Sequence, residues 1–197
     1  DNGSVPIIMP RKNYKNSYNH PLKRGKWDAT EGGIRVPFIV TGPEIKPNSQ
    51  AEIPISFSDL LPTIIDLAGG KENLKNEKLD GGSFKQVLLN KSKNIKRNFN
   101  GIVFHVPYEN KIALGRAHSA IIVDKMKFIK FYDNNETRLF NLKYDIKENE
   151  NLVVKRKKLA HKLEQKMINY LMNVKAPKWK PGITWKRKTL DLINSYH

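Results

Sequence analysis

Cysteine is absent from the 197 residues, which excludes disulfide bonds, thiolate metal ligands and a cysteine nucleophile within this sequence. Long apolar runs are also absent, because no stretch approaches the about 18 residues that a membrane-spanning helix needs. The sequence begins at Asp1 with neither an initiator methionine nor a signal-peptide pattern. We therefore expect a piece of a longer chain, whose localisation is unknown from these residues.

Acidic residues are scarce. The chain has 19 Asp and Glu against 36 Lys and Arg, a net charge of +17. Residues 151–197 contribute +10 of this, with twelve Lys and Arg against Glu164 and Asp191. Such a surface attracts nucleic acid, anionic membranes or acidic polysaccharide. Two interpretations stay open: a composition bias spread over solvated faces, or a selected polyanion-binding surface.

The first half of the chain predicts an α/β layer. The continuous apolar run at 34–40 favours a strand covered on both faces. A helix is predicted over 58–69, with Ser58 as its N-cap, Leu60, Ile64 and Leu67 on one face, and Gly69 at its end. A short helix is expected at 83–89. The polar, lysine-rich stretch that follows predicts a division into residues 1–97 and 98–197.

The second half predicts an antiparallel sheet. Strand-like runs occupy 101–106, 118–123, 127–132 and 137–142, and most of the links between them are short. One long helix is predicted over 152–174, because Leu163, Met167 and Leu171 recur at four-residue spacing. The tail from Ala176 onward, with its prolines and tryptophans, is expected to pack as an irregular strap.

One basic loop stands out in the first half. Residues 23–33 read KRGKWDATEGG and run into the apolar segment at 34–40, which suggests a loop at a sheet edge that holds an anion. Lys26 is a compact donor to a tetrahedral oxyanion; alternatively, it is an exposed lysine paired with Glu31. Asp1 and Asn2 offer the oxygen ligands that Ca²⁺ prefers, although Asp-Asn-Gly is also a common turn.

Other catalytic signatures are missing from the sequence. It contains no His-x-x-x-His zinc pair, no Gly-x-Ser-x-Gly elbow and no phosphate-binding glycine loop. His20, His105 and His118 are scattered, and each is open to a structural or surface role as well as a catalytic one. The residues alone therefore leave the reaction undecided.

An ordered set of segments resembles the C-terminal part of the type I sulfatases, the formylglycine-dependent family with the alkaline-phosphatase-like fold. The segments between Asp1 and Pro177 are DNG, PLKRGKWDATEGGIRVPFIVTGP, SFSDLLPTIIDLAG, LDGGSF, FHVPY, HSAIIVDKMKFIKFY and LFNLKYDIKENENL. The resemblance implies the C-terminal portion of that α/β fold, with a small antiparallel sheet packed on a long C-terminal helix.

The resemblance also implies roles for particular residues. Asp1 and Asn2 match the Asp-Asn pair that ligates one active-site Ca²⁺, and Lys26 matches the lysine that contacts the sulfate group. The implied reaction is hydrolysis of a sulfate ester, of a sulfated carbohydrate or an aryl sulfate, with formylglycine as nucleophile. Further contacts to the sugar or aryl part are implied for His20, Arg24, His105 and His118.

The sequence departs from the family pattern in three ways. The nucleophile signature, Cys or Ser-x-Pro-x-Arg, is absent, as are the early aspartates of the calcium site. We therefore expect the nucleophile and the remaining ligands in a missing N-terminal part, and no turnover from these residues alone. KWDAT stands where a smaller run like KGT is commoner. The family is usually periplasmic, secreted or lysosomal.

Two rival functions remain open. A phosphatase or phosphonate hydrolase of the same fold would use a Thr or Ser nucleophile and more His and Asp metal ligands. A non-catalytic polyanion-binding module would use the net charge and the basic tail. The sequence contains no nucleic-acid-binding motif, and no nucleic-acid partner is expected.

Overall fold

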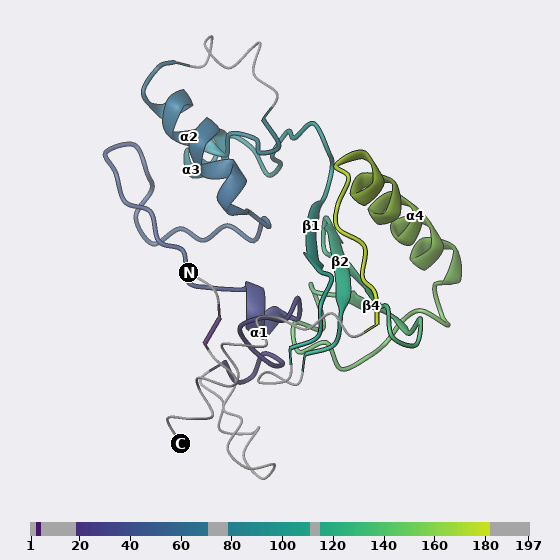
Figure 1. Cartoon of the computed structure of the whole chain (residues 1–197). Coiled ribbons are helices and arrows are strands. Elements are labelled where there is room, and N and C mark those ends of the chain that lie inside the picture. Colours follow the sequence, from purple (N-terminus) through teal and green to yellow (C-terminus); the bar gives the residue numbers. More distant parts are fainter. Residues whose placement is uncertain (1–2, 5–18, 71–78, 111–114, 182–197) are drawn as a thin grey trace, which may run out of the picture. The chain divides into compact units, whose positions relative to one another are not determined.

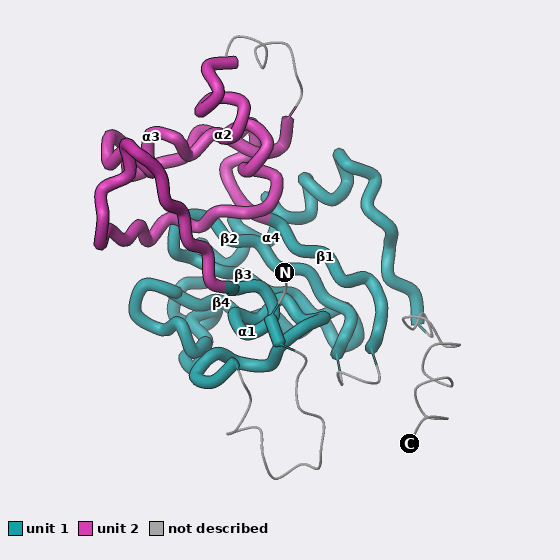
Figure 2. Tube along the Cα trace, turned by 90° about the vertical axis from the view of Figure 1, so that its left-hand side faces the viewer, with its two compact units in different colours: residues 1–36, 103–197 teal, residues 37–102 magenta. Residues whose placement is uncertain are grey.

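The computed structural model describes residues 3–4, 19–70, 79–110 and 115–181. The chain divides into two compact units, residues 1–36 with 103–197 and residues 37–102 (Figure 2). These units describe which residues pack together and do not test the predicted domain boundary after residue 97, which stays a prediction. None of the described helices is long and apolar enough to cross a bilayer.

The first unit is built on a four-stranded sheet (Figure 1). Its strands are β1 (Ile102–Val106), β2 (His118–Val123), β3 (Met126–Phe131) and β4 (Thr137–Asn141), in the order β1-β2-β3-β4. β3 pairs antiparallel with both β2 and β4. The predicted antiparallel sheet is confirmed, with strand ends within one residue of those expected.

The register gives this sheet two different faces. His118 pairs with Phe131, and Ile122 pairs with Lys127, so these four side chains share one face because side chains alternate along a strand. That face packs on the segment before it in sequence, since Ala29 belongs to the same buried cluster as Ile122 and Phe131. The sheet therefore places the 23–33 region directly against its core.

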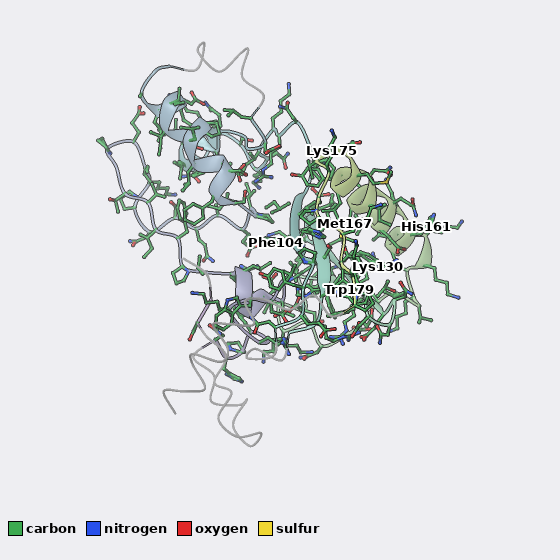
Figure 3. The ribbon with its side chains drawn as sticks, in the orientation of Figure 1. Phe104, Lys130, His161, Met167, Lys175 and Trp179 are labelled. Atoms are coloured by element: carbon green, nitrogen blue, oxygen red, sulfur yellow. The ribbon has the colours of Figure 1, made fainter. Side chains whose placement is uncertain are left out.

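The opposite face packs against α4 (Lys157–Asn173), the long C-terminal helix that the sequence predicts. The helix begins at Lys157 and not at the predicted residue 152, because residues 153–156 form turns. Leu163 and Met167 are buried on it, and Lys130 of β3 pairs with Glu164 at 2.6 Å. Figure 3 shows Met167 on the side of α4 toward the sheet and His161 on its outer side. The four-residue spacing thus identified the buried stripe correctly.

Residues 176–181 have no regular secondary structure and pack as the predicted strap. The ring of Trp179 stacks on Tyr132, with centroids 6.5 Å apart. Nε2 of His105 is hydrogen-bonded to the carbonyl oxygen of Pro177 at 2.7 Å. The start of the basic tail is therefore held on the sheet by one stacked ring and one hydrogen bond.

The second unit contains η2 (Phe57–Asp59), α2 (Leu60–Leu67) and α3 (Lys85–Leu88). The predicted helix over 58–69 is confirmed, and Gly69 follows it at φ +83°. Ser58 is not its cap: the N-cap of α2 is Asp59, and the preceding η2 has Ser56 as its N-cap. The Ser56 N–H donates to the Asp59 carboxylate at 2.8 Å, as in a capping box.

The buried side of α2 differs from the predicted one. Ile64 and Leu67 are 61% and 47% exposed, whereas Thr63 and Asp66 are buried. The cause is Asp59, which is fully buried and accepts bonds from Arg97 and from the Gly82 N–H. This network holds the helix with Thr63 and Asp66 on its buried side.

The predicted strand at 34–40 is wrong. Residues Glu31–Ile34 form the short helix α1, and residues 35–40 pair with no strand in the described part of the chain. Ile39 is 86% exposed, and Phe38 packs edge-on against Phe84 at 5.9 Å. An apolar run forms a strand only where a neighbouring strand completes its hydrogen bonds, and the described strands all belong to the sheet of the first unit.

Candidate functional site

The KRGKWDATEGG segment forms a closed loop, here called the 23–33 loop. The carbonyl oxygen of Lys23 accepts the N–H of Gly32 at 2.9 Å and the hydroxyl of Thr30 at 2.8 Å. The two ends of the loop therefore meet. Of the residues between them, Asp28, Ala29 and Thr30 are buried, whereas Lys26 and Trp27 are half-buried. The predicted loop is confirmed for residues 23–30, and residues 31–33 form the start of α1.

The DNG motif ends against this loop. The N–H of Gly3 donates to the carbonyl oxygen of Gly33 at 3.0 Å. A Cβ on Gly3 would lie 1.8 Å from the Gly32 oxygen, and one on Gly33 would lie 2.0 Å from the Asp28 oxygen. Glycine is needed here because two backbones approach too closely for a side chain.

Asp1 and Asn2 lie outside the described residues, so calcium ligation by them stays a prediction. Gly3, the residue that follows them, is hydrogen-bonded to Gly33. The described residues contain no cluster of three or more acidic or histidine side chains that would hold a metal by itself.

Lys26 lies in the outer part of the loop and is half-buried. Its N–H donates to the Ser4 carbonyl oxygen at 3.0 Å. The side-chain amide of Asn19 donates to the carbonyl oxygens of Ser4 and Arg24, at 2.9 and 3.0 Å. The backbone around Lys26 is thus held by the residue that follows the DNG motif.

The alternative of a Lys26–Glu31 ion pair is wrong. Glu31 is 2% exposed and pairs with Lys127 and Arg35, at 3.0 and 2.6 Å. Among the described residues, no carboxylate pairs with the Lys26 ammonium. Its Nζ lies 5.7 Å from the ring centroid of Trp27.

Two residues beside Lys26 have left-handed backbone conformations. Arg24 has φ +57° and Trp27 has φ +72°, a region that costs a side-chain-bearing residue energy and glycine little. Such strain clusters at functional sites, where the surrounding structure enforces it.

Arg24 turns part of its guanidinium inward. Its Nε donates to the carboxylate of Asp28, which also accepts the Thr30 N–H at 2.8 Å. Burial alone would raise the pKa of Asp28, but Arg24, His118 and the Thr30 bonds outweigh it and lower that pKa. The side chain of Arg24 keeps 29% exposure, and its predicted substrate contact stays a prediction.

His118 is brought to the loop, but in a structural position. It is 1% exposed, its Nε2 accepts the N–H of Ala29 at 2.9 Å, and its Nδ1 donates to the Arg116 carbonyl oxygen at 2.5 Å. Burial lowers its pKa, consistent with a neutral ring. This geometry speaks against the predicted substrate contact, because both nitrogens are used inside the protein.

The other two histidines occupy different places. His105 lies on the face of β1 opposite Phe104, which packs on the Ala29 cluster. Its Nδ1 is 2.6 Å from the Ser119 hydroxyl, and its Nε2 binds the strap. The structure therefore does not bring His105 to the 23–33 loop. His20 is exposed just before the loop, and its predicted contact stays a prediction.

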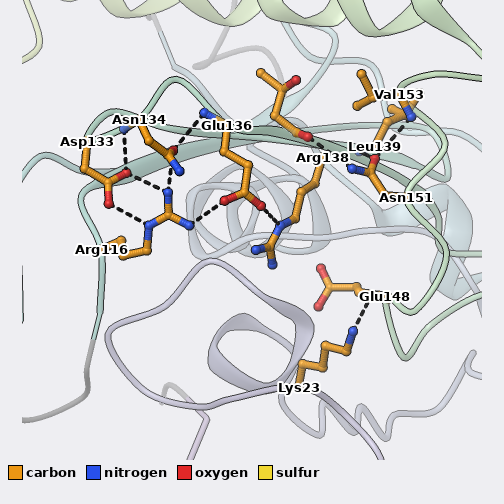
Figure 4. Close-up of polar contacts among 11 residues, drawn as sticks. Lys23, Arg116, Asp133, Asn134, Glu136, Arg138, Leu139, Glu148, Asn151 and Val153 are labelled. Atoms are coloured by element: carbon orange, nitrogen blue, oxygen red, sulfur yellow. Dashed lines mark hydrogen bonds and ion pairs between the residues drawn. The ribbon is translucent and has the colours of Figure 1, made fainter.

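An ionic network covers the end of β2 and β3 near His118 (Figure 4). Arg116 donates to Asp133 and Glu136, at 2.7 and 2.6 Å, and Arg138 donates to Glu136 at 2.6 Å. Both guanidiniums lie over the ring of Phe131. The network holds Arg116, whose carbonyl oxygen fixes the ring of His118.

Sequence reasoning missed two buried residues below the loop, Lys127 and Glu148. Lys127 is fully buried, and Glu148 is 2% exposed. The signal for Lys127 was its register with Ile129 and Phe131, because alternation in a half-buried strand turns all three to one face. Glu148 lies in a turn-rich stretch, where no such pattern exists.

The family model for the C-terminal region of N-sulphoglucosamine sulphohydrolase matches residues 25–176. The chain is 34% identical over 143 residues to an ulvan-active sulfatase of Formosa agariphila, covering 71% of this chain and 27% of that protein. It is 43% identical over 58 residues to the N-acetylglucosamine-6-sulfatase of Bos taurus, covering 29% of this chain and 10% of that protein.

A solved structure, Ps i-CgsB in complex with k-i-k-neocarrahexaose, has the same fold, with a TM-score of 0.67 and 24% identity over 99% of this chain and 39% of that one. The chain spans less than a third of the length of the curated sulfatases named above. From the match to residues 25–176, the chain belongs to the sulfatase family, as a C-terminal region of the N-sulphoglucosamine sulphohydrolase type.

Proposed function

We propose that the full-length protein hydrolyses sulfate esters of a sulfated sugar or glycan, and that the 23–33 loop supplies part of its sulfate site. One observation carries this proposal. The backbone bonds from Gly3 to Gly33 and from Lys26 to Ser4 join the DNG motif to the lysine loop. Two segments with the residue types for binding a cation and a sulfate group are thereby tied together.

Lys26 is the residue that we assign to the sulfate group. An ammonium donates up to three hydrogen bonds and stabilises charge that develops on transferring oxygens. The absence of a carboxylate partner among the described residues leaves this ammonium for an anion. The closed loop holds its backbone, so little reorganisation is needed when the substrate binds.

Asp1 and Asn2 are assigned to a Ca²⁺ ion. Their donor set fits, because carboxylate and amide oxygens are the hard ligands that Ca²⁺ takes, but two residues cannot fill six to eight positions. The other ligands and the formylglycine nucleophile would come from outside this sequence. When bound, the ion would offset negative charge on the sulfate oxygens.

A polymeric substrate is favoured by the charge of α4 and of the residues before it. Lys155, Arg156, Lys157 and Lys158 are all exposed and line a shallow depression with Val154 and Leu159. Similar proteins include a sulfatase named for activity on ulvan and a structure holding a neocarrahexaose. We infer that this cluster attracts a sulfated polysaccharide to the protein.

The test compares an aryl sulfate with the matching aryl phosphate on the full-length protein. Faster cleavage of the sulfate is expected, and faster cleavage of the phosphate would favour a phosphatase of the same fold. Lys26→Ala should lower kcat/KM for the sulfate about 100-fold, the scale of losing one donor to a developing oxyanion. Lys143→Ala, at an exposed position, is the matched control and should change little.

A binding-only function gives a different result. Tight, salt-sensitive binding of a polyanion without any sulfate release would contradict the proposed activity and favour a polyanion-binding module. The Lys26→Ala variant separates the two functions, because one lysine among 36 basic residues would hardly change such binding.

A further inference from the structure

A buried ionic cluster lies beneath the 23–33 loop. The ammonium of Lys127, on β3, is fully buried and lies 3.0 Å from a Glu31 carboxylate oxygen and 2.8 Å from a Glu148 carboxylate oxygen. A buried charge is costly unless it is paired and hydrogen-bonded. Glu31 accepts a further hydrogen bond from Arg35 and Glu148 Oε2 accepts one from the Glu31 N–H. Glu148 Oε1 has the Lys127 ion pair but no hydrogen bond, and burial raises the pKa of Glu148.

Glu148 also binds the loop, through its carboxylate and through its backbone oxygen. Glu31 is the first residue of α1, and its N–H donates to Glu148 Oε2 at 2.9 Å. The ammonium of Lys23 donates to the backbone oxygen of Glu148 at 2.6 Å (Figure 4). Lys23 is at the start of the loop and Glu31 is near its end, where the loop closes. The cluster therefore connects both ends of the loop to β3.

An ionic cluster is one of two ways to fill such a buried position, and apolar packing is the other. Replacing a buried ion pair by well-packed apolar residues is often neutral or stabilising, and the neighbours of Lys127 on the same sheet face include Ile122, Ile129 and Phe140. What an apolar side chain would not supply is a donor that joins Glu31 to Glu148. The contacts therefore indicate a role in the placement of the loop.

We propose that Lys127 is a positioning residue for Lys26: it fixes Glu31 and Glu148, and through them the closed loop that presents the Lys26 ammonium to the sulfate group. The inference rests on the proposed function, because it needs Lys26 to bind sulfate. It adds a residue on β3 that does not touch the substrate.

The test is a double-mutant cycle on the full-length protein, with Lys26→Ala and Lys127→Met as its two changes. If Lys127 acts through Lys26, Lys127→Met should lower kcat/KM for an aryl sulfate about tenfold to hundredfold, the scale of a misplaced catalytic group. In the Lys26→Ala background the same change should have no further effect. Binding of inorganic sulfate as a competitive inhibitor should show the same coupling.

The matched control is Lys130→Met. Lys130 is on the same strand and also pairs with a glutamate, but on the α4 face. It should leave kcat/KM within about twofold in both backgrounds. If Lys127→Met fails to fold, Lys127→Arg, which keeps the charge, takes its place in the cycle. Lys127→Arg should lower kcat/KM by less than Lys127→Met, and this loss should also disappear in the Lys26→Ala background.

The failures are distinguishable. An equal loss from Lys127→Met, or from Lys127→Arg where that variant is used, in both backgrounds would overturn the positioning role and leave the proposed function intact. If Lys26→Ala itself leaves kcat/KM and sulfate inhibition unchanged, the assignment of Lys26 fails and the positioning role fails with it.

Discussion

The backbone N–H of Ala29 donates to Nε2 of His118 at 2.9 Å, across 89 positions of the sequence. The bond joins the 23–33 loop to a neutral imidazole on the first residue of β2. Asp28, Arg24 and Lys127 are the charged groups that act on this ring, and only Asp28 favours its charged form. A histidine in this position makes the anchoring of the loop sensitive to pH.

We expect His118 to make the fold lose stability in mild acid. Its folded pKa is lowered from the ordinary 6.5, so the unfolded chain binds the proton more readily. The stabilisation is complete above pH 6.5 and is lost as the pH falls toward the folded pKa. His118→Gln should be less stable at about pH 8, by about 2 kcal/mol for a buried hydrogen bond lost, and the difference should narrow toward about pH 5.

Thermal unfolding across this pH range, on the wild type and the variant, measures the difference. His161→Gln, on the exposed side of α4, is the control and should follow the wild-type curve. A His118→Gln difference that stays constant from about pH 8 to about pH 5 would contradict the prediction.

Gly33→Ala should distort the loop and the end of the DNG motif together. The new Cβ would meet the carbonyl oxygens of Asp28 at 2.0 Å and Gly25 at 2.5 Å, and backbone atoms have no room to move aside. We expect kcat/KM for an aryl sulfate to fall at least about tenfold. Gly42→Ala, whose nearest contact is Ile45 Cδ1 at 3.5 Å, is the matched change; equal activities of the two variants would disprove the close-approach argument.

Asp59→Asn should weaken the second unit. Asp59 is fully buried and binds Arg97 through Nε at 2.8 Å and through a terminal nitrogen at 2.7 Å. The neutral side chain leaves the Arg97 guanidinium with its bond to the Pro54 carbonyl oxygen but without a carboxylate in a poorly hydrated position, which costs about 3 kcal/mol. Hydrogen exchange of the amides in α2 measures this loss locally, with Asp80→Asn at an exposed position as control.

The acid sensitivity of this pair has a definite sign. Burial would raise the pKa of Asp59, but Arg97 and the N–H groups of Gly82 and Ser56 lower it below the ordinary 3.8. Its contribution is therefore present above pH 3.8 and is lost as the pH falls toward the folded pKa. In the wild type, protection of the α2 amides from hydrogen exchange should decline as the pH falls below 3.8. Unchanged protection below that pH would contradict the prediction.

Neutralising the basic cluster at 155–158 should affect large substrates only. With all four residues changed to glutamine, we expect a higher KM for a sulfated polysaccharide and an unchanged KM for a small aryl sulfate, because attraction of a polyanion depends on the summed field. The polymer effect should shrink as salt is added. Equal effects on both substrates would disprove the role of the cluster.

The prediction of the C-terminal helix and sheet worked because their patterns are local. Leu163 and Met167 face the sheet as four-residue spacing requires, and the strands of the sheet begin and end where apolar alternation meets turn residues. The helix α2 was predicted, but its buried face was predicted wrongly, because that face was chosen from the apolar residues Leu60, Ile64 and Leu67 alone. Asp59 and Arg97 lie 38 positions apart, and no local pattern shows that they meet.

By itself, the sequence determined the sheet and the long helix of the first unit and pointed to Lys26, Gly32 and Gly33 as the loop that matters, since residue type, spacing and motif order are properties of the chain. Only the tertiary structure decided what holds that loop. It paired Glu31 with Lys127 instead of Lys26, turned His118 inward and joined Gly3 to Gly33. The physical reason is that buried polar groups must find partners, and those partners come from strands and turns far away in the sequence.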